Sequence, residues 1–489
     1  SGGGSSSGGG SSGGGSSGGG TPPPPAPEPD VSDGTPAATV TRMSNGCSVD
    51  QATGGFKDKG LTIEEVNWIQ VVQQNVLDPN LKLVANKDLR LRVDVTAKTA
   101  GQKLPASATL RVSLNSGGCR DYTLTTSATT APTTINRLVL TNSYVAMIPA
   151  ADVTSDLKSV QFAIDADRQS TSAAADRLYV EMPINTGAVI AEALLIVPVE
   201  FELQTGSFPA NADLEALIRR AFPHQNVTVQ SSAPITGPAT LRKSNAISVT
   251  PDGIYTFGFK VMEDTLRDIE TRCYDLNPGF TRVSETTKCA GVFPANIRFI
   301  DDRPGGGGGV AGLGYVGGLS LLTTSFSASD NNSVTGPYLA SPWLAIEAGY
   351  FIHELSHVMT LDHANCGNPA TVDADLYADG TLGDGGGFDI GRNFYFSGTD
   401  NDFCDVMSYC GVKTWMSDKG FRKIVDYKRG NETDAGTSPS APTIRTQAQP
   451  QEQRGLRIVR VNGVWRANRA MIPAVALESI HIKDAGSIS

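Results

Sequence analysis

This 489-residue sequence has no excess of positive charge, few cysteines and no long apolar run. Its 50 acidic side chains outnumber 40 lysines and arginines, so it lacks the basic charge that binds phosphate backbones, and we expect no nucleic-acid partner. The closest candidate for a membrane span, residues 188–201, contains Glu192 and Glu200 and is shorter than the roughly twenty apolar residues required. These absences predict a soluble protein, long enough for two or three domains.

The seven cysteines do not form the paired CxxC knuckles of a structural zinc finger. Because they are spread along the chain, they favour disulfides plus one leftover thiol, a pattern typical of secreted or cell-surface proteins. The plausible pairs are Cys47 with Cys119, Cys273 with Cys289, and Cys366 with either Cys404 or Cys410.

Residues 1–39 form a low-complexity segment that cannot build a packed core. The first part contains only Ser and Gly, typical of flexible coil, and the Pro-rich part that follows is typical of a stiffer spacer. Because position 1 is not Met, we expect that a leader has been removed. The segment resembles the tether of bacterial lipoproteins, although no Cys lies within it. A membrane anchor of that kind is one hypothesis, and an artificial linker is the other.

Residues 40–190 are predicted to form an all-β domain. Every second residue is apolar in Leu89–Val95 and again in Ala108–Leu114, which is the period of a half-buried strand. Several such runs without helical periodicity indicate a β-sandwich of immunoglobulin-like type. Its role as spacer, substrate-binding module or stabilising partner stays open.

Residues 191–430 combine strand and helix patterns, which gives the chain an α+β fold class. We expect helices at 264–274, 343–360 and 418–426, and one capped by Asn211 that buries Leu214, Leu217, Ile218 and Phe222. Strands are predicted at 194–203, 227–230, 254–261 and 296–300. Residues 431–489 are polar and predict a small β appendage with strands at 456–461 and 475–482.

The strongest chemical signal is the HExxH pattern His353-Glu-Leu-Ser-His357, continued to His363. Residues four apart lie on one face of a helix, so the first two histidines can bind one ion, with His363 as the third ligand. Glu354 points elsewhere and is predicted to be the general base that takes a proton from a zinc-bound water. Three imidazoles leave a fourth position open, as at a catalytic zinc. Only five histidines occur, and three lie in this segment.

On these residues the chain resembles the metzincin zinc metallopeptidases, whose pattern is HExxHxxGxxH followed by a methionine turn. The turn is matched by Asp405-Val-Met407-Ser-Tyr409, and the stretches around Cys366 and Trp415 resemble secreted bacterial and reprolysin-like members. The resemblance spans roughly residues 194–427. It implies a metzincin-type catalytic domain, a twisted mixed sheet with an active-site helix, after the immunoglobulin-like sandwich. Met407 would form a hydrophobic floor under the histidines. Tyr409 would ligate zinc or support the oxyanion, the alternative being a packed tyrosine.

One departure concerns the helix end, where Thr360 replaces the glycine of the family pattern. That glycine adopts a left-handed conformation, which costs a β-branched residue about 1–2 kcal/mol. We therefore expect either a strained Thr360 or a different end to the helix.

Two further patterns allow alternative interpretations. Gly312, Gly314 and Gly317 form a GxGxxG, but strand follows it where a dinucleotide site needs a helix, so it favours an edge strand that pairs with a peptide. The loop between His363 and Met407 contains five aspartates that offer weak support for calcium, although a solvated acidic loop is favoured: Asp373, Asp375, Asp379, Asp384 and Asp389.

The sequence thus predicts a secreted or cell-surface zinc endopeptidase that hydrolyses internal bonds of extracellular proteins or glycoproteins. The alternatives are a surface-binding module with a weakly active or inactive protease-derived domain, and a structural surface protein in which zinc stabilises the fold. The free coordination position and Glu354 argue against the structural role.

Overall fold

The structure of the chain is a computed structural model. It describes residues 57–58, 60–105, 107–164, 178–278, 286–303, 309–324, 346–367, 369, 371–398, 403–409, 413–430, 453–461 and 464–472. The chain divides into two compact units, Ser1–Asn431 and Glu432–Ser489, which we describe separately. The predicted linker, residues 1–39, lies outside the described residues. None of the described helices is both long and apolar enough to cross a membrane.

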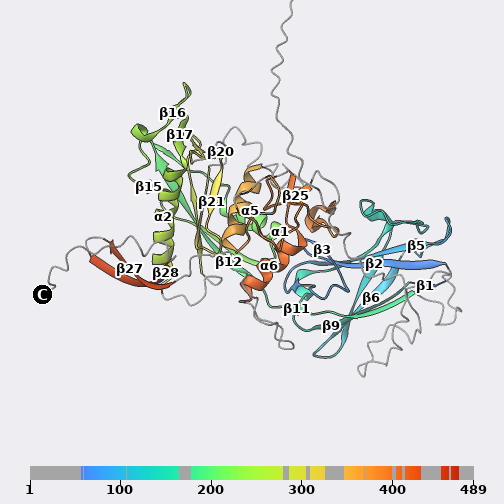
Figure 1. Cartoon of the computed structure of the whole chain (residues 1–489). Helices are drawn as coiled ribbons and strands as arrows, with labels where there is room; N and C mark the ends of the chain where they lie inside the picture. Colours follow the sequence, from blue (N-terminus) through green and yellow to red (C-terminus); the bar gives the residue numbers. More distant parts are fainter. Residues whose placement is uncertain are drawn as a thin grey trace, which may run out of the picture. The chain divides into compact units, whose positions relative to one another are not determined.

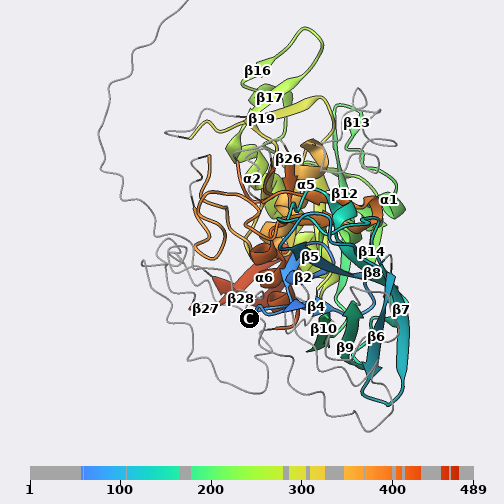
Figure 2. The same ribbon diagram turned by 90° about the vertical axis from the view of Figure 1, so that its right-hand side faces the viewer.

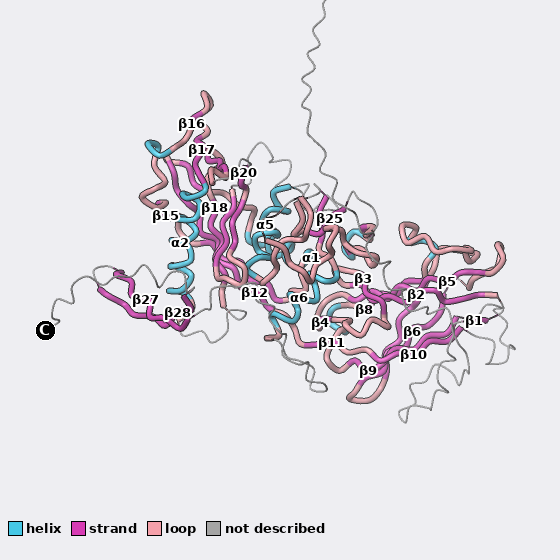
Figure 3. The backbone as a smooth tube through the Cα atoms, viewed as in Figure 1, coloured by secondary structure: helices cyan, strands magenta, loops and turns pink. Residues whose placement is uncertain are grey.

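The N-terminal part of the first unit, residues 57–187 (the β-domain), is built from strands, with α-helix absent from its described residues (magenta in Figure 3). The strands are β1 (Lys57–Asp58), β2 (Leu61–Ile69), β3 (Gln73–Asn75), β4 (Leu83–Val84), β5 (Leu89–Ala97), β6 (Ser107–Leu114), β7 (Cys119–Thr125), β8 (Tyr144–Ile148), β9 (Leu157–Ile164), β10 (Leu178–Pro183) and β11 (Thr186–Gly187). Two 3-10 turns, Leu140–Asn142 and Ala150–Asp152, flank β8. The strands predicted from alternation are present as β5 and β6.

Most strands of the β-domain form one antiparallel path, β1-β2-β5-β8-β7-β6-β9-β10, with β3 beside β2, while β4 pairs in parallel with β11 in a separate small sheet. Figure 2 shows β7, β6 and β9 side by side. The link between β7 and β8 is a single pair, Thr125 with Val145. Alternate apolar residues of β5 enter a core around Trp68 and Phe162. The described strands fall into this path and the β4–β11 pair, and the immunoglobulin-like type stays a prediction.

Residues 191–430 of the same unit contain a mixed sheet centred on β12 (Ala191–Phe201). β14 (Asn226–Ser231) and β15 (Ile235–Thr236) run parallel to one side of β12, while β18 (Lys288–Val292) and then β22 (Ser320–Thr323) run parallel on the other. β13 (Gln204–Thr205) pairs antiparallel with the end of β12. The order ends at β21 (Gly312–Gly314), which is antiparallel to β22. The GxG segment is therefore an edge strand of the described sheet, as predicted.

Among the described residues, four helices accompany this sheet: α1 (Asn211–Ala221), α2 (Phe259–Leu276), α5 (Ile346–Val358) and α6 (Asp418–Lys428). α5 packs on β21 and β22, and α2 packs on β18 and β22 (Figure 1). Residues 343–345 of the predicted active-site helix lie outside the described residues. The predicted buried face of α1 is present, with Leu214, Leu217, Ile218 and Phe222 all buried.

Two predicted helix starts were wrong, because distant residues contact the N-terminal turns. Asn211 does not cap α1. It is the first helical residue, and its side chain accepts a hydrogen bond from Ser231 Oγ at 2.9 Å. The second helix begins at Phe259, where a strand was expected, and Asp302 Oδ1 accepts the Phe259 N–H at 2.9 Å. This cap lies 43 residues away, so no local pattern reveals it.

The remaining short elements belong to small sheets. One contains β16 (Ser248–Val249), β17 (Tyr255–Gly258), β19 (Ile297–Ile300) and β20 (Gly309–Val310), with a 3-10 turn at Lys243–Asn245 before it. A hairpin joins β23 (Gly387–Asp389) to β24 (Phe394–Phe396) through the turn Ile390–Arg392, and β25 (Phe403–Asp405) runs parallel to β26 (Lys413–Trp415). In the second unit, β27 (Gln453–Val461) and β28 (Val464–Ile472) form a hairpin, and the predicted strand 475–482 lies outside the described residues.

The cysteine predictions are confirmed in part. Cys273 on α2 and Cys289 on β18 form the expected disulfide. Cys366 is also disulfide-bonded, whereas Cys404 is a free buried thiol, so Cys404 is not its partner. The alternative partner Cys410 lies outside the described residues. The predicted disulfide between Cys47 and Cys119 was wrong, because Cys119 is an exposed free thiol. With Cys404 this makes two free thiols among the described cysteines, where one was expected.

Candidate metal centre

The helix α5 ends in a hydrogen-bonded cap that turns the chain toward His363. The Leu361 N–H donates to Ser356 O at 3.1 Å and the Thr360 N–H to His357 O at 2.9 Å. This pair of bonds is a Schellman motif, in which the first residue after the helix adopts a left-handed conformation. Thr360 takes that position with φ 75°. The expectation of a strained Thr360 is therefore confirmed, and the helix ends in a left-handed turn with Thr where the resemblance implied Gly.

Replacing Thr360 with Gly is expected to stabilise the protein by about 0.5–1 kcal/mol. The change removes a left-handed β-branched residue worth about 1–2 kcal/mol, and the greater freedom of Gly in the unfolded chain offsets part of that gain. Urea unfolding of both proteins measures the difference. Thr360→Ala is the matched control, because it keeps a Cβ at positive φ and should give no such gain. A Thr360→Gly protein less stable than the wild type would contradict the strain.

The three predicted histidines converge. Their candidate ligand atoms all lie within 4.8 Å of one another, and His357 Nε2 is 3.2 Å from His363 Nε2. The Nδ1 of His353 contacts Val406 O at 2.7 Å, and the Nδ1 of His357 contacts Leu361 O at 2.8 Å. A carbonyl oxygen can only accept a hydrogen bond, so the ring nitrogen that contacts it must carry the proton. Both rings are therefore protonated on Nδ1 and present Nε2 as a free ligand. Such fixed tautomers are what a bound cation requires.

The protonation of these histidines also suits a metal. Burial lowers the pKa of His353 to about 3 and that of His357 to about 4, with a smaller effect from neighbouring imidazoles. Burial likewise lowers the pKa of His363. The rings are therefore neutral at pH 7, and a metal would not have to displace protons from the ligand nitrogens.

The third candidate ligand, His363, is held by a network that the sequence did not reveal. Asp362 Oδ1 lies 3.2 Å from His363 Nδ1 and accepts the His363 N–H at 2.8 Å. The buried Asp373 accepts the Asp362 N–H at 3.2 Å, and its own N–H donates to His363 O at 2.7 Å. Lys423 on α6 then neutralises Asp373 at 2.7 Å. A lysine 50 residues away thus fixes the loop that presents His363.

The predicted methionine turn lies directly against the histidine cluster. Met407 is fully buried in the same core as Leu355 of α5, and its carbonyl accepts the Ala364 N–H at 2.9 Å. Asp405, buried at the start of the turn, accepts the N–H of Met407 at 2.7 Å and that of Ser417 at 3.2 Å. Asp405 therefore ties the turn to the beginning of α6, a role that was not predicted.

Glu354 lies beside the histidines but outside their ligand set. Its side chain is buried against β21, where the Gly314 N–H hydrogen-bonds the carboxylate. A Cβ added to Gly312 would come within 2.5 Å of Glu354 Cγ. The glycines are thus required for the close approach of α5 to the edge strand. Burial raises the pKa of Glu354 to about 8, and a nearby cation would favour its ionised form.

Tyr409 also reaches the cluster. Its hydroxyl lies 2.6 Å from His363 Nε2, yet the residue is 55 % exposed, which does not fit an ordinary packed tyrosine. The exposure of the residue as a whole does not extend to its hydroxyl, which lies against His363, and desolvation there together with the charge of Glu354 raises the pKa of Tyr409 to about 12. The phenol is therefore a neutral hydrogen-bond donor at pH 7.

The aspartate-rich loop gives no support for the weak calcium hypothesis. Asp389 is buried and contacts Arg220 at 2.8 Å and Arg392 at 2.7 Å, while Asp373 is paired with Lys423. These carboxylates are already neutralised by side-chain cations. Across the described part of the chain, the three histidines are the only group of His, Cys, Asp or Glu placed to share an ion.

No model of a known protein family matches this chain, and the search of curated proteins finds no relative of it. The geometry of the site is therefore the main guide to its function.

Proposed function

We propose that this protein is a zinc-dependent endopeptidase of the metzincin type. The observation that carries the proposal is the convergence of three neutral, tautomer-fixed imidazoles beside one buried carboxylate that is not a ligand. His353, His357 and His363 would hold the metal. Zinc, when bound, supplies a Lewis acid that polarises a carbonyl and brings the pKa of water to about 7.

The residues of the chain supply the other parts of the reaction. Glu354 takes the proton of the attacking water and returns it to the leaving amine. Tyr409 donates its hydroxyl hydrogen to the developing oxyanion, for which its neutral phenol at pH 7 is suited. β21, which is paired on one side only among the described strands, binds the substrate as an added extended strand. Extended binding favours internal peptide bonds, which is why an endopeptidase is proposed.

The disulfides support a location outside the cytoplasm. Cys273–Cys289 and the bonded Cys366 are stable in an oxidising compartment. The substrates are then extracellular proteins or glycoproteins, and a lipid anchor before residue 1 remains a hypothesis.

The experiment is to measure metal content together with cleavage of an unfolded protein such as casein. We expect one zinc per chain, loss of cleavage after chelation and recovery when zinc is returned. Bound zinc without cleavage, across several plain and glycosylated proteins, would refute the peptidase and favour the surface-binding module.

A further inference from the structure

The β-domain and the region that carries the metal centre share a hydrophobic core. Val71 and Val72, between β2 and β3, are fully buried in the same cluster as Phe351 and Leu355 of α5. Val72 forms an antiparallel bridge with Gly387 of β23, and a Cβ on Gly385 would come within 2.6 Å of Gln73 O. The backbones therefore meet as closely as strands of one sheet, and separating them would expose core surface to water.

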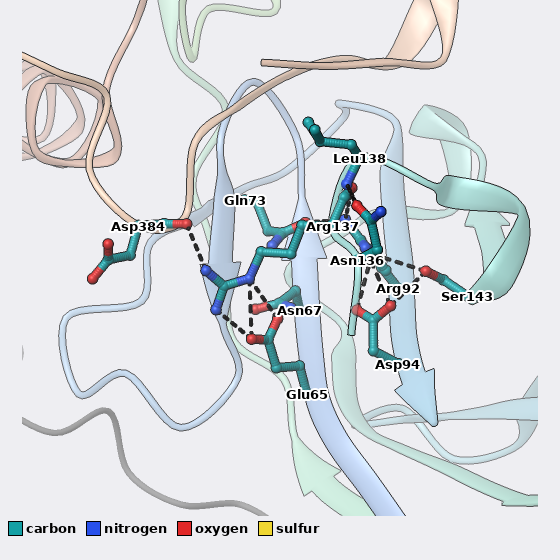
Figure 4. A network of polar contacts seen from close by, with 10 residues as sticks. All are labelled: Glu65, Asn67, Gln73, Arg92, Asp94, Asn136, Arg137, Leu138, Ser143 and Asp384. Atoms are coloured by element: carbon teal, nitrogen blue, oxygen red, sulfur yellow. Dashed lines mark hydrogen bonds and ion pairs between the residues drawn. The ribbon is translucent and has the colours of Figure 1, made fainter. Parts of the chain in front are cut away.

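Charged side chains surround this apolar contact. Arg137 of the β-domain donates to Glu65 within the domain and to the carbonyl of Asp384 at 3.2 Å (Figure 4). Behind it, the fully buried Arg92 pairs with Asp94 at 2.9 Å. Glu65, Arg92 and Asp94 lie on the face of β2 and β5 opposite the core of the β-domain, where strand alternation alone would place exposed side chains.

Arg92 and a second arginine of β5, Arg90, contact aromatic rings of the β23–β24 hairpin. Arg92 lies 5.7 Å from the ring centre of Tyr395, and Arg90 lies 5.0 Å from that of Phe388. Arg90 in addition donates to the side chain of Asn393. The β-domain thus contacts the β23–β24 hairpin through both cation–π interactions and a side-chain hydrogen bond.

A short chain of hydrogen bonds leads from this interface to a metal ligand. Trp415 Nε1 donates to Val71 O at 2.9 Å, although the two residues are 344 positions apart. The carbonyl of Trp415 accepts the Val406 N–H at 2.8 Å, and the carbonyl of Val406 contacts His353 Nδ1 at 2.7 Å. The β-domain is therefore connected to His353 through only two residues.

Trp415 is rigidly held in this position. Its side chain is fully buried and stacks on Phe396 at 4.4 Å between ring centres, with Arg220 over the ring at 5.2 Å. A Cβ on Gly387 would lie 2.3 Å from Trp415 Cδ1, so only Gly fits opposite the indole. A shift of the β-domain would move Trp415, and with it the carbonyl that orients His353.

We infer that the β-domain is a built-in positioning element of the metal centre, with Trp415 as the residue that couples the two. This inference rests on the proposed zinc site and deepens it. The β-domain thereby sets the tautomer and orientation of His353, and so the affinity for zinc. It is not a detachable binding module, because its valines complete the core beneath the active-site helix.

The test is the zinc dissociation constant of the full chain, measured by competition with a chromogenic chelator. Trp415→Phe removes the N–H to Val71 but keeps a ring on Phe396, and Val71 O still accepts the Phe388 N–H at 2.9 Å. We expect zinc to bind about tenfold more weakly, the lower end for groups that orient metal ligands. Trp68→Phe is the matched control, because Trp68 is fully buried in the β-domain and its Nε1 has no hydrogen-bond partner among the described residues. It should leave zinc affinity unchanged.

A second variant approaches the coupling from the β-domain side. Arg137→Ala, which removes the bond to the Asp384 carbonyl, should also weaken zinc binding, and it keeps the test valid if Trp415→Phe fails to fold. The coupling would be overturned if Trp415→Phe bound zinc as tightly as the wild type. If Trp415→Phe does not fold, wild-type zinc affinity in Arg137→Ala would overturn it instead. A zinc affinity lowered equally in Trp415→Phe and in the control Trp68→Phe would also overturn it. These results would leave the peptidase proposal intact, whereas a wild-type chain that binds no zinc would overturn both.

Discussion

Glu354→Gln is expected to lower the rate of peptide hydrolysis by about 10²–10⁴-fold, the usual contribution of a general base, while zinc stays bound. Gln has the shape of Glu and can still accept the Gly314 N–H, but its amide cannot take a proton from water. Zinc should be retained, because the three histidines form the ligand group without Glu354. Initial rates of casein cleavage and metal analysis of the same samples measure both effects.

A loss of stability should not account for the lower rate in Glu354→Gln. Burial keeps the Glu354 carboxyl neutral at pH 7 in the metal-free protein, with a pKa of about 8, so a neutral amide replaces a neutral acid at little cost. Glu200→Gln, at an exposed position of β12, is the matched control for the same chemical change and should keep full activity. Wild-type turnover in Glu354→Gln would remove the base from the mechanism. Loss of zinc in that variant would instead indicate a ligand or structural role.

The parts of the site that could be predicted are those with a local period. The pair His353 and His357 follows from the spacing of one helical turn, and the departure at Thr360 follows from the backbone conformation that its position requires. Met407 and Tyr409 were placed by resemblance, and the structure brings both to the cluster.

The missed parts depend on contacts between residues distant in sequence. Lys423 reaches Asp373 across 50 positions, and Trp415 reaches Val71 across 344. Neither pair has a period or motif, since each exists only after sheets and helices have packed. The burial of Arg92 was missed for the same reason, because alternation along β5 indicates which face it occupies but not what covers that face.

Asp405→Ala is expected to destabilise the protein by about 3 kcal/mol, the second-largest effect we predict. The change leaves the buried N–H groups of Met407 and Ser417 without acceptors, and each orphaned group costs about 1–3 kcal/mol. Because these bonds tie the methionine turn to α6, zinc should also bind more weakly. Urea unfolding gives the stability, and Asp268→Ala on the exposed side of α2 is the control for loss of a carboxylate.

The pH dependence separates the charge of Asp405 from its hydrogen bonds. Burial raises the pKa of Asp405 to about 6 from its ordinary 3.8, so the folded state holds this proton more tightly than the unfolded state does. Its stabilising contribution is therefore complete below about pH 4 and is lost as the pH rises through 6. The amide in Asp405→Asn cannot titrate, so the free energy of unfolding of this variant should lack that part of its pH dependence. The variant should also lose less stability than Asp405→Ala, because the amide keeps one acceptor oxygen. The free energy of unfolding could instead change with pH in the same way for Asp405→Asn and wild type between pH 4 and 6. That result would show that Asp405 has the same pKa in the folded and unfolded states, and its role would then rest on the two hydrogen bonds alone.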